Sequence, residues 1–324
     1  MKRAGWVLAV LAAAVCCACC TAFAEEAAEE VTYTCGDYKY VLREDGSAEV
    51  VGYTGPGGDI MIPNDLDGHP IMAMRTNVFS KRLYVSDNYT VSVHEDHPYL
   101  ATINGVLFGK TDRRLICCPY ALKQTEYMIP QGIEQIGDDA FGFCAGLTSV
   151  TIPESVTSIG DEAFFGCRRL TSVTIPHSVT SIGDAAFAGC RSLTSVTIPN
   201  SVTSIANYAF SECFGLTSIT ISDSVSGIGD DTFYACVGLT AVAIPDSVTS
   251  IGDRAFFGCR SLTSVTIPDS VTSIGALAFD ECPNLTLSVL AGSCAETYCQ
   301  ENNLPCIPCD PTLEDAPTDR LGGN

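Results

Sequence analysis

The sequence predicts a β-rich α/β solenoid, with a parallel sheet built from stacked 23-residue coils and short helical turns, and three observations lead to it. Seven cysteines recur 23 residues apart without an insertion, at Cys144, Cys167, Cys190, Cys213, Cys236, Cys259 and Cys282. The surrounding text repeats as LTSVTIPxSVTSIGDxAFxGCxx, with leading leucines at Leu147, Leu170, Leu193, Leu216, Leu239 and Leu262 and a degenerate copy at Leu285. Polar and apolar residues alternate within each copy. Such a fixed period is typical of units that bury a continuous core only when stacked.

The N-terminus predicts export. Lys2 and Arg3 precede an uncharged apolar run that ends in Ala22-Phe23-Ala24, the small-x-small pattern of a signal-peptidase site. We expect residues 1–24 to be a cleaved signal peptide and the mature protein to be secreted or held at the cell surface, without a membrane span. An uncleaved N-terminal anchor stays open, because the uncharged run is long enough to cross a bilayer. Acylation of a cysteine in this segment is a further alternative.

Residues 25–126 precede the regular repeats. We expect residues 25–58 to be a linker and a cap of strands, because the open end of a solenoid would otherwise expose apolar core. Residues 59–126 are interpreted as a divergent repeat with an irregular insert. Within the insert, Asn104-Gly105 predicts a hairpin between residues 100–103 and 106–108.

Residues 127–284 are the regular repeats, and one copy illustrates them all. Val150 alternates with Ser149 and Thr151, which predicts a strand with one buried face, and Pro153 ends that strand because proline cannot donate to a ladder. Val156 and Ile159 are then expected to point inward, followed by a turn at Gly160.

An aspartate follows that glycine in most copies, and we expect it to cap a single helical turn by accepting free amides. This slot holds Asp138, Asp161, Asp184, Asn207, Asp230 and Asp253, with Ala276 as the exception. The turn then supplies an aromatic ladder of Phe141, Phe164, Phe187, Phe210, Phe233, Phe256 and Phe279.

The C-terminal end is predicted to close the solenoid. Residues 285–309 are interpreted as a cap made of a strand at 285–290 and a short helix at 293–302. Residues 310–324 are rich in Pro, Asp and Gly and lack apolar periodicity, so we expect a disordered tail.

Charge and motifs narrow the function. The chain has 38 acidic and 17 basic residues, a formal net charge of −21, which makes nucleic acid an improbable partner. No nucleophile elbow, phosphate loop or HExxH motif occurs, so no catalysis and no cofactor are expected. The sequence HEDH, His94 to His97, lies in the irregular insert and is interpreted as an exposed polar loop rather than a metal site.

The repeats closely resemble the BspA-like leucine-rich repeat family of exported and surface proteins. The resemblance covers residues 33–306 and is carried by the repeats, by the interruption Asp96 to Phe108 followed by Leu115 to Pro119, and by the ending Ala291 to Tyr298. It implies a solenoid that binds other proteins or cell surfaces, without a shared catalytic residue. This chain departs from the family's pattern at Ser222, Gly227 and Ala276, which suggests local irregularity near the fourth regular repeat.

Two sets of surface positions are candidate binding residues. The outward strand positions form Ser and Thr ladders, including Thr151, Thr174 and Thr197, which either dock a partner or are ordinary solvent-facing strand residues. Positions where the repeats differ are better suited to specific recognition, because arginines and aromatic residues anchor protein interfaces. They are Arg168, Arg169, Arg191, Phe214 and Tyr234. Neutral drift on a convex surface is the alternative for this second set.

The cysteines fall into two groups. The periodic ones recur among Ala and Phe positions and are interpreted as core residues. Cys294, Cys299, Cys306 and Cys309 lie outside the period, and we expect two disulfides that staple the cap. A four-thiolate zinc site or free thiols remain the alternatives.

The sequence therefore predicts a non-enzymatic exported protein that mediates binding or adhesion to a protein or glycan on a host or neighbouring cell. A structural or self-assembling surface protein is the alternative, and an enzyme that uses the irregular insert is the third. The oligomeric state stays open.

Overall fold

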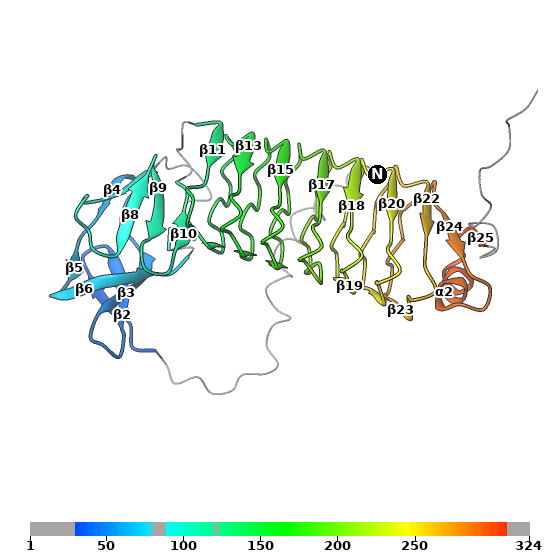
Figure 1. The fold of residues 1–324 in the computed structure, drawn as a ribbon, viewed down its shortest axis with the longest axis horizontal. Coiled ribbons are helices and arrows are strands. Elements are labelled where there is room, and N and C mark those ends of the chain that lie inside the picture. The colour runs from blue at the N-terminus through cyan, green and yellow to red at the C-terminus, as the bar shows by residue number, and fades with distance from the viewer. Residues whose placement is uncertain (1–29, 77, 80–88, 120–121, 123, 310–324) are drawn as a thin grey trace, which may run out of the picture.

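The computed structural model describes residues 30–76, 78–79, 89–119, 122 and 124–309. Figure 1 shows an elongated, gently curved solenoid whose coils follow one another along its long axis. The predicted fold class is confirmed, because equivalent residues of successive coils pair in parallel and in register, Ser149 with Ser172 and then Thr151 with Thr174. The predicted signal peptide and tail lie outside the described residues.

Strands near the N-terminus form a five-stranded sheet at one end of the solenoid, in the order β1-β2-β3-β6-β5 (Figure 1). They are β1 (Tyr33–Cys35), β2 (Tyr38–Leu42), β3 (Ala48–Tyr53), β5 (Asp65–Leu66) and β6 (His69–Met74). Strands β4 (Gly58–Ile62) and β7 (Tyr89–Val93) pair in parallel beside this sheet. The region has its own buried cluster, which includes Val50, Ile62 and Ile71.

The predicted hairpin is present and begins one of the solenoid sheets. Strands β8 (Leu100–Ile103) and β9 (Val106–Gly109) are antiparallel, and Asn104 and Gly105 both have positive φ, 52° and 84°. That pair of angles is typical of the turns that match strand twist. Strand β10 (Arg114–Cys117) pairs with β9 on one side and in parallel with β12 (Gln135–Ile136) on the other. The insert is therefore continuous with the repeats.

Each regular coil contributes one strand to a front sheet and one to a back sheet, except the coil of β17, which has only an isolated bridge at Ile205 in the back sheet. The front sheet contains β11 (Glu126–Met128), β13 (Ser149–Thr151), β15 (Ser172–Thr174), β17 (Ser195–Thr197), β18 (Ser218–Thr220), β20 (Ala241–Ala243), β22 (Ser264–Thr266) and β24 (Thr286–Val289). The back sheet contains β12, β14 (Ser158–Ile159), β16 (Ser181–Ile182), β19 (Gly227–Ile228), β21 (Ser250–Ile251) and β23 (Ser273–Ile274). In each coil, Pro or Ser222 separates the two strands.

The core lies between the two sheets and the turns. The predicted phenylalanine ladder is confirmed, since its rings stack with centroids 5.0–5.8 Å apart and planes within 20° of each other. The leucine, valine, isoleucine and periodic cysteine positions form parallel rows in one continuous buried cluster. Every coil thus buries the same side chains against the next, as a one-dimensional array requires.

The segment that carries the phenylalanine differs in detail from the expected helical turn. It is a run of hydrogen-bonded turns in which the residue after the Asx slot is left-handed in each coil, with φ of 52–58°. These residues are Asp139, Glu162, Ala185, Tyr208, Asp231, Arg254 and Leu277. The conformation is unfavourable for residues other than glycine, but in the first six of these coils the amide of the left-handed residue donates to the next coil, as from Glu162 N to Asp184 O at 2.8 Å.

Both sheets are interrupted at the same place. Strands β15 and β17 are not paired, and in the back sheet a single bridge at Ile205 replaces a strand. Elsewhere a coil donates to its predecessor in the pattern Thr180 N to Thr157 O and Gly183 N to Ile159 O, both at 2.9 Å. Among the described residues, the equivalent bonds from Thr203 and Ala206 are not formed.

A strand and a helix close the C-terminal end, as predicted. After β24, helix α2 (Cys294–Asn302) begins at Ser293, whose side chain accepts from Glu296 N. Tyr298 packs edge-on against Phe279, with ring centroids 6.2 Å apart, and so ends the aromatic ladder. The chain then returns as β25 (Cys306–Pro308), parallel to β24. No helix in the described part of the chain has the length and apolar character needed to span a membrane.

Candidate functional site

The front sheet presents two kinds of outward threonine, and the structure separates them by their hydrogen bonds. The first kind precedes the strand, and each of its hydroxyls donates to the backbone carbonyl of the equivalent residue one coil earlier, at 3.0–3.4 Å. This row is Thr148, Thr171, Thr194, Thr217, Thr240 and Thr263. Because these hydroxyls are already bonded between coils, their role is structural.

The second kind lies within the strand and includes the predicted binding residues Thr151, Thr174 and Thr197. All three are exposed, and their hydroxyls make no hydrogen bond to the described part of the chain. The same holds for Ser172, Ser195 and Ser218 on the same face. Paired strands of a parallel sheet repeat every ~4.8 Å, so this face is an array of hydroxyls that are available to a ligand, with an interruption between β15 and β17. We call this surface, from Thr151 to Thr220, the hydroxyl face.

Variable residues line the margin of the hydroxyl face. Arg168, Arg191 and Phe214 occupy one repeat position, four residues before the strand, and therefore lie one coil apart in a row. The Arg191 guanidinium sits 4.9 Å above the Phe214 ring and also pairs with Glu212 at 3.3 Å. Arg168 and its neighbour Arg169 are exposed, and among the described residues their side chains have no partner. The structure thus brings four predicted site residues together as one margin row.

Tyr234 lies apart from this row, in the turn that carries the phenylalanine. It is half-buried and stacks on Phe257 with ring centroids 5.3 Å apart and planes 6° from parallel. The neighbouring Asp231 is buried, which raises the pKa of its carboxyl, while Arg254 donates to it at 3.0 Å. Tyr234 therefore packs against the neighbouring coil and lies apart from the other four predicted residues.

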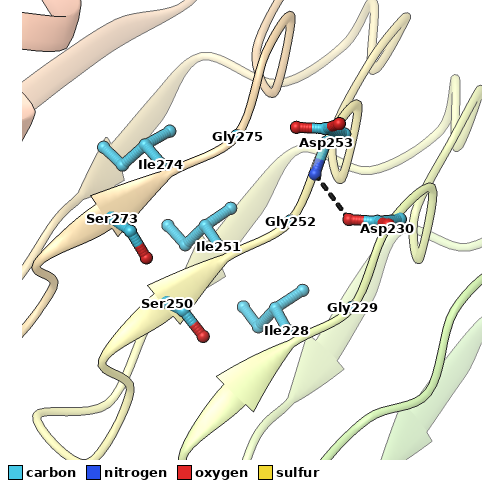
Figure 2. Close-up of a pocket in the computed structure, with 10 residues that line it drawn as sticks. All are labelled: Ile228, Gly229, Asp230, Ser250, Ile251, Gly252, Asp253, Ser273, Ile274 and Gly275. Atoms are coloured by element: carbon cyan, nitrogen blue, oxygen red, sulfur yellow. Dashed lines mark hydrogen bonds between the residues drawn. The ribbon is translucent and has the colours of Figure 1, made fainter.

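The back sheet carries a shallow groove of about 400 Å³ that sequence reasoning missed (Figure 2). Ser250 and Ser273 lie along one side and Ile228, Ile251 and Ile274 along its floor, while Asp230 and Asp253 lie beyond the glycines. The repeated Ser-Ile-Gly triplets could have predicted this groove, because their small residues leave the surface of the strands open.

The aspartates of that groove belong to a ladder that runs the length of the array. Each Asx side chain accepts the backbone amide of the same slot in the next coil, at 2.7–3.0 Å, as Asp230 does from Asp253 N (Figure 2). The predicted cap within one coil is wrong in this respect, because the acceptor serves the neighbouring coil. Ala276 needs no such side chain, since it donates to Asp253 and no regular coil follows it.

The periodic cysteines are buried core residues, as predicted. From Cys167 to Cys282, each sulfur lies 3.1–3.2 Å from the carbonyl oxygen of the phenylalanine one coil earlier, to which the thiol donates. Burial raises the pKa of the thiols of Cys167, Cys190, Cys213 and Cys236, in the last case to about 12. A thiol that stays protonated and bonded is a poor nucleophile or metal ligand.

The remaining candidates are the four C-terminal cysteines and the HEDH sequence. Cys299 is buried, Cys306 is exposed, and the two thiols interact. His97 was predicted to lie in an exposed loop, but its side chain is buried. Its Nδ1 accepts from Tyr99 N and Leu100 N at 3.2 and 3.1 Å, so the ring stabilises a turn. In the described residues, no group of three or more His, Cys, Asp or Glu could hold a metal ion.

Comparisons with known proteins agree with this architecture. The family model for the BspA type leucine rich repeat region matches residues 117–240 and 226–300, in six copies. A comparison with curated proteins finds no match.

Among solved structures, a leucine-rich repeat protein from Eubacterium ventriosum is 27% identical with a TM-score of 0.62. The match covers 69% of this chain but only 58% of that one. A leucine rich cell surface protein from Faecalibacterium prausnitzii is 23% identical with a TM-score of 0.36, and the match covers 83% and 97% of the two chains. A leucine-rich repeat protein from Bacteroides ovatus is 24% identical with a TM-score of 0.38, and there the shares are 79% and 70%.

Proposed function

The chain belongs to the BspA-type leucine-rich repeat family, and from this premise we propose that it is an exported, non-catalytic surface protein that binds a protein or glycan on a host or neighbouring cell. The repeats supply a rigid scaffold, and solenoids of this kind commonly bind through their extended surfaces. Export is supported by the residue pattern of the first 24 positions. The binding surface should then be the part of the scaffold whose polar side chains are not already hydrogen-bonded within the fold.

The observation that carries the proposal is the division between the two threonine rows. A hydroxyl that donates to the neighbouring coil, like that of Thr171, is occupied by the fold. The hydroxyls of Thr151, Thr174 and Thr197 are exposed and not used by the described part of the chain. An array of such donors and acceptors suits a ligand that is itself rich in hydroxyls or amides, such as a glycan or an extended peptide.

The margin row adds directional contacts to this array. Arg168 and Arg169 present charged groups with no partner among the described residues, next to the strand that begins at Ser172. Arginine and aromatic side chains contribute most to interfaces when a partner covers them. We therefore assign recognition to the margin row and extended contact area to the hydroxyl face. Tyr234 contributes less, because Phe257 already covers its ring.

The experiment compares two triple variants of the full chain. Thr151, Thr174 and Thr197 are changed to valine in one, and Ser158, Ser181 and Ser273 on the back sheet are changed to alanine in the control. Retention is measured on immobilised glycans and on intact cells. We expect the front-sheet variant to lose about tenfold in affinity, which is ~1.4 kcal/mol, and the control to bind like the wild type. Equal binding by both variants would remove the hydroxyl face as the site.

A variant with Arg168 and Arg169 changed to alanine tests the margin row separately. Neither side chain has a partner among the described residues, so the thermal unfolding midpoint should stay unchanged while retention falls. Retention equal to that of the wild type would show that the margin row does not contribute to binding.

Self-assembly is the second candidate, and the exposed C-terminal strand favours it. All three residues of β25 are exposed, and Ile307 is 54% exposed on an edge that the described chain leaves unpaired. Unpaired edges template strand addition. Light scattering across a dilution series would then show growth with concentration, which Ile307→Lys should abolish; a constant monomer mass for the wild type would rule this candidate out.

A further inference from the structure

The chain reverses direction immediately after helix α2, and Cys299 is at the centre of the reversal. Asn303 caps the helix in the left-handed conformation, with φ 53° and ψ 38°, and its amide donates to Cys299 O. The Leu304 amide donates to the same oxygen at 3.0 Å. Two donors on one carbonyl fold residues 303–305 back across the last helical turn.

The returning chain is held in place by the solenoid. Leu287 N donates to Pro305 O at 2.9 Å, and Cys306 is the register partner of Leu287 in β24. Helix α2 also packs on β24, which places Cys299 and Cys306 on either side of one small reversal. Burial raises the pKa of Cys299 to about 12, and the nearby Cys306 thiol adds to that rise.

Strand β25 has little else to hold it. It contains three residues, all exposed, and it pairs with β24 on one side only. A strand with no buried side chain at a sheet edge opens readily, because few contacts oppose its separation. A covalent link between this strand and the buried face of α2 would close the end of the solenoid.

We propose that Cys299 and Cys306 are an oxidisable pair that forms a disulfide and thereby fastens β25 to α2. Four cysteines allow three pairings, and the geometry points to this pair because the reversal after α2 returns Cys306 to the sheet beside the helix that carries Cys299. The inference is independent of what the hydroxyl face binds.

The chemistry is thiol–disulfide exchange with a disulfide oxidant. The exposed Cys306 loses its proton and attacks one sulfur of the oxidant, which forms a mixed disulfide and releases the first thiol. Cys299 then loses its proton and attacks the Cys306 sulfur, which breaks the mixed disulfide and releases the second thiol. The two cysteines together give up two protons and two electrons, and the oxidant is reduced to two thiols.

The test uses the full chain and glutathione disulfide as the oxidant. After treatment, the protein is denatured, free thiols are alkylated, and the chain is cut with a glutamate-specific protease without reduction. Cleavage after Glu296, Glu301 and Glu314 separates Cys299, in residues 297–301, from Cys306, in residues 302–314. We expect mass spectrometry to find these two peptides joined, at two hydrogen masses below the sum of peptide 297–301 and peptide 302–314 alkylated at Cys309.

Two matched variants identify the partner of Cys299. The joined species should persist in Cys309→Ser, which keeps the proposed pair, and disappear in Cys306→Ser. Recovery of peptide 297–301 with an alkylated Cys299 from the wild type would overturn the proposal, as would a link that survives in Cys306→Ser or glutathione attached to Cys306 alone. Cys309→Ser and the wild type decide the question even where Cys306→Ser does not fold.

Discussion

At the scale of single residues, two threonines in one coil show how the fold divides its surface. Thr171 and Thr174 are both exposed, one just before β15 and one at its end, but only Thr171 has a hydroxyl that reaches the preceding coil, at 3.0 Å from Thr148 O. The first hydroxyl is part of the stacking contact between coils, and the second is left to solvent or a ligand. Stability and binding should therefore respond to different threonines.

Substitution of each threonine by valine tests this division. Thr171→Val removes one hydrogen bond and should lower the free energy of unfolding by about 1 kcal/mol. Thr174→Val should change it by less than about 0.5 kcal/mol, because no bond is lost at an exposed strand position. Urea denaturation of both variants measures the difference. Equal effects would mean that the hydroxyl row does not stabilise the stack.

The buried thiols make stability depend on pH in the alkaline range. The unfolded chain ionises Cys236 near its ordinary pKa of 9.0, whereas the folded protein retains the proton until about 12. The stability that this protonated thiol contributes is thus fully present below about pH 9 and is lost as the pH rises toward 12. Burial also raises the pKa of the thiols of Cys167, Cys190 and Cys213, so these three sites act in the same direction.

The variant Cys236→Ala isolates one thiol. Under reducing conditions at pH 8 it should cost about 1–2 kcal/mol, since a packed atom and its hydrogen bond are lost. At pH 10 the cost should shrink by about 1.4 kcal/mol, because only the wild type still has a thiol that ionises on unfolding. Val225→Ala, a buried change that does not titrate, should cost the same at both pH values. A pH-independent cost for Cys236→Ala would show that its proton is not retained in the fold.

The sequence predicts which residues point inward but not what the outward ones bind. Alternation alone assigns Val173 to the core and Thr174 to the surface, because successive strand residues face opposite sides. It cannot distinguish Thr171 from Thr174, since the difference depends on how closely one coil approaches the next. Arg191 and Phe214 were both identified as variable residues. Their stacking at 4.9 Å was not predicted, because it also depends on how closely one coil approaches the next.

At the scale of elements, the turns depart most from expectation. An aspartate after glycine is a helix-cap signal when read within one segment. In a stacked array the nearest free amide belongs to the next coil, so the carboxyl of Asp161 accepts from Asp184 N at 2.8 Å. Local sequence carries no information about that neighbour. The ladder becomes predictable only when the 23-residue period is used to align one coil on another.

The glycine before each Asx residue allows one coil to approach the next closely. In one coil this position is Ala206 instead of glycine. A side chain at Gly252 would place its Cβ 2.6 Å from Asp230 N and from the carbonyl carbon of Gly229, too near for either to remain in place. Ala206 has such a Cβ. At the adjoining coils both sheets are interrupted, and the backbone hydrogen bonds expected from Thr203 and from Ala206 are absent among the described residues.

We therefore expect Ala206→Gly to stabilise the protein by about 1 kcal/mol. Two backbone hydrogen bonds would form, from residue 206 to Ile182 O and from Thr203 to Thr180 O, and together they exceed the entropic cost of glycine. Gly252→Ala should instead destabilise by about 2–3 kcal/mol, because the added methyl group overpacks the same contact. Thermal unfolding compares the variants, and hydrogen exchange at Thr203 reports whether its amide becomes protected. Loss of stability in Ala206→Gly would show that the interruption has another cause.

At the scale of the whole molecule, the solenoid behaves as a row of equivalent units with distinct ends. The regular repeats could be placed from the sequence because every coil buries the same rows of Leu, Val, Ile, Phe and Cys. The N-terminal region could not be placed in the same detail, since its separate cluster is formed by strands without a common period. The hairpin of this region was predicted from Asn104-Gly105. The parallel pairing of the next strand, β10, with β12 through Arg114 and Gln135 was not predicted.

Removal of one complete coil tests whether the units are equivalent. Deletion of residues 239–261 takes out 23 positions and joins Gly238 to Leu262, so that Phe233 would stack on Phe279 and Asp230 would accept the Ala276 amide. We expect a single cooperative unfolding transition with an m-value lower by roughly 8%, because m scales with the surface exposed on unfolding. Deletion of residues 239–260 removes one position fewer. It shifts the following coil by one residue and turns its apolar side chains outward. That protein should lose the cooperative transition measured by urea denaturation, and equal stability of the two deletions would contradict a stack held in register by its core rows.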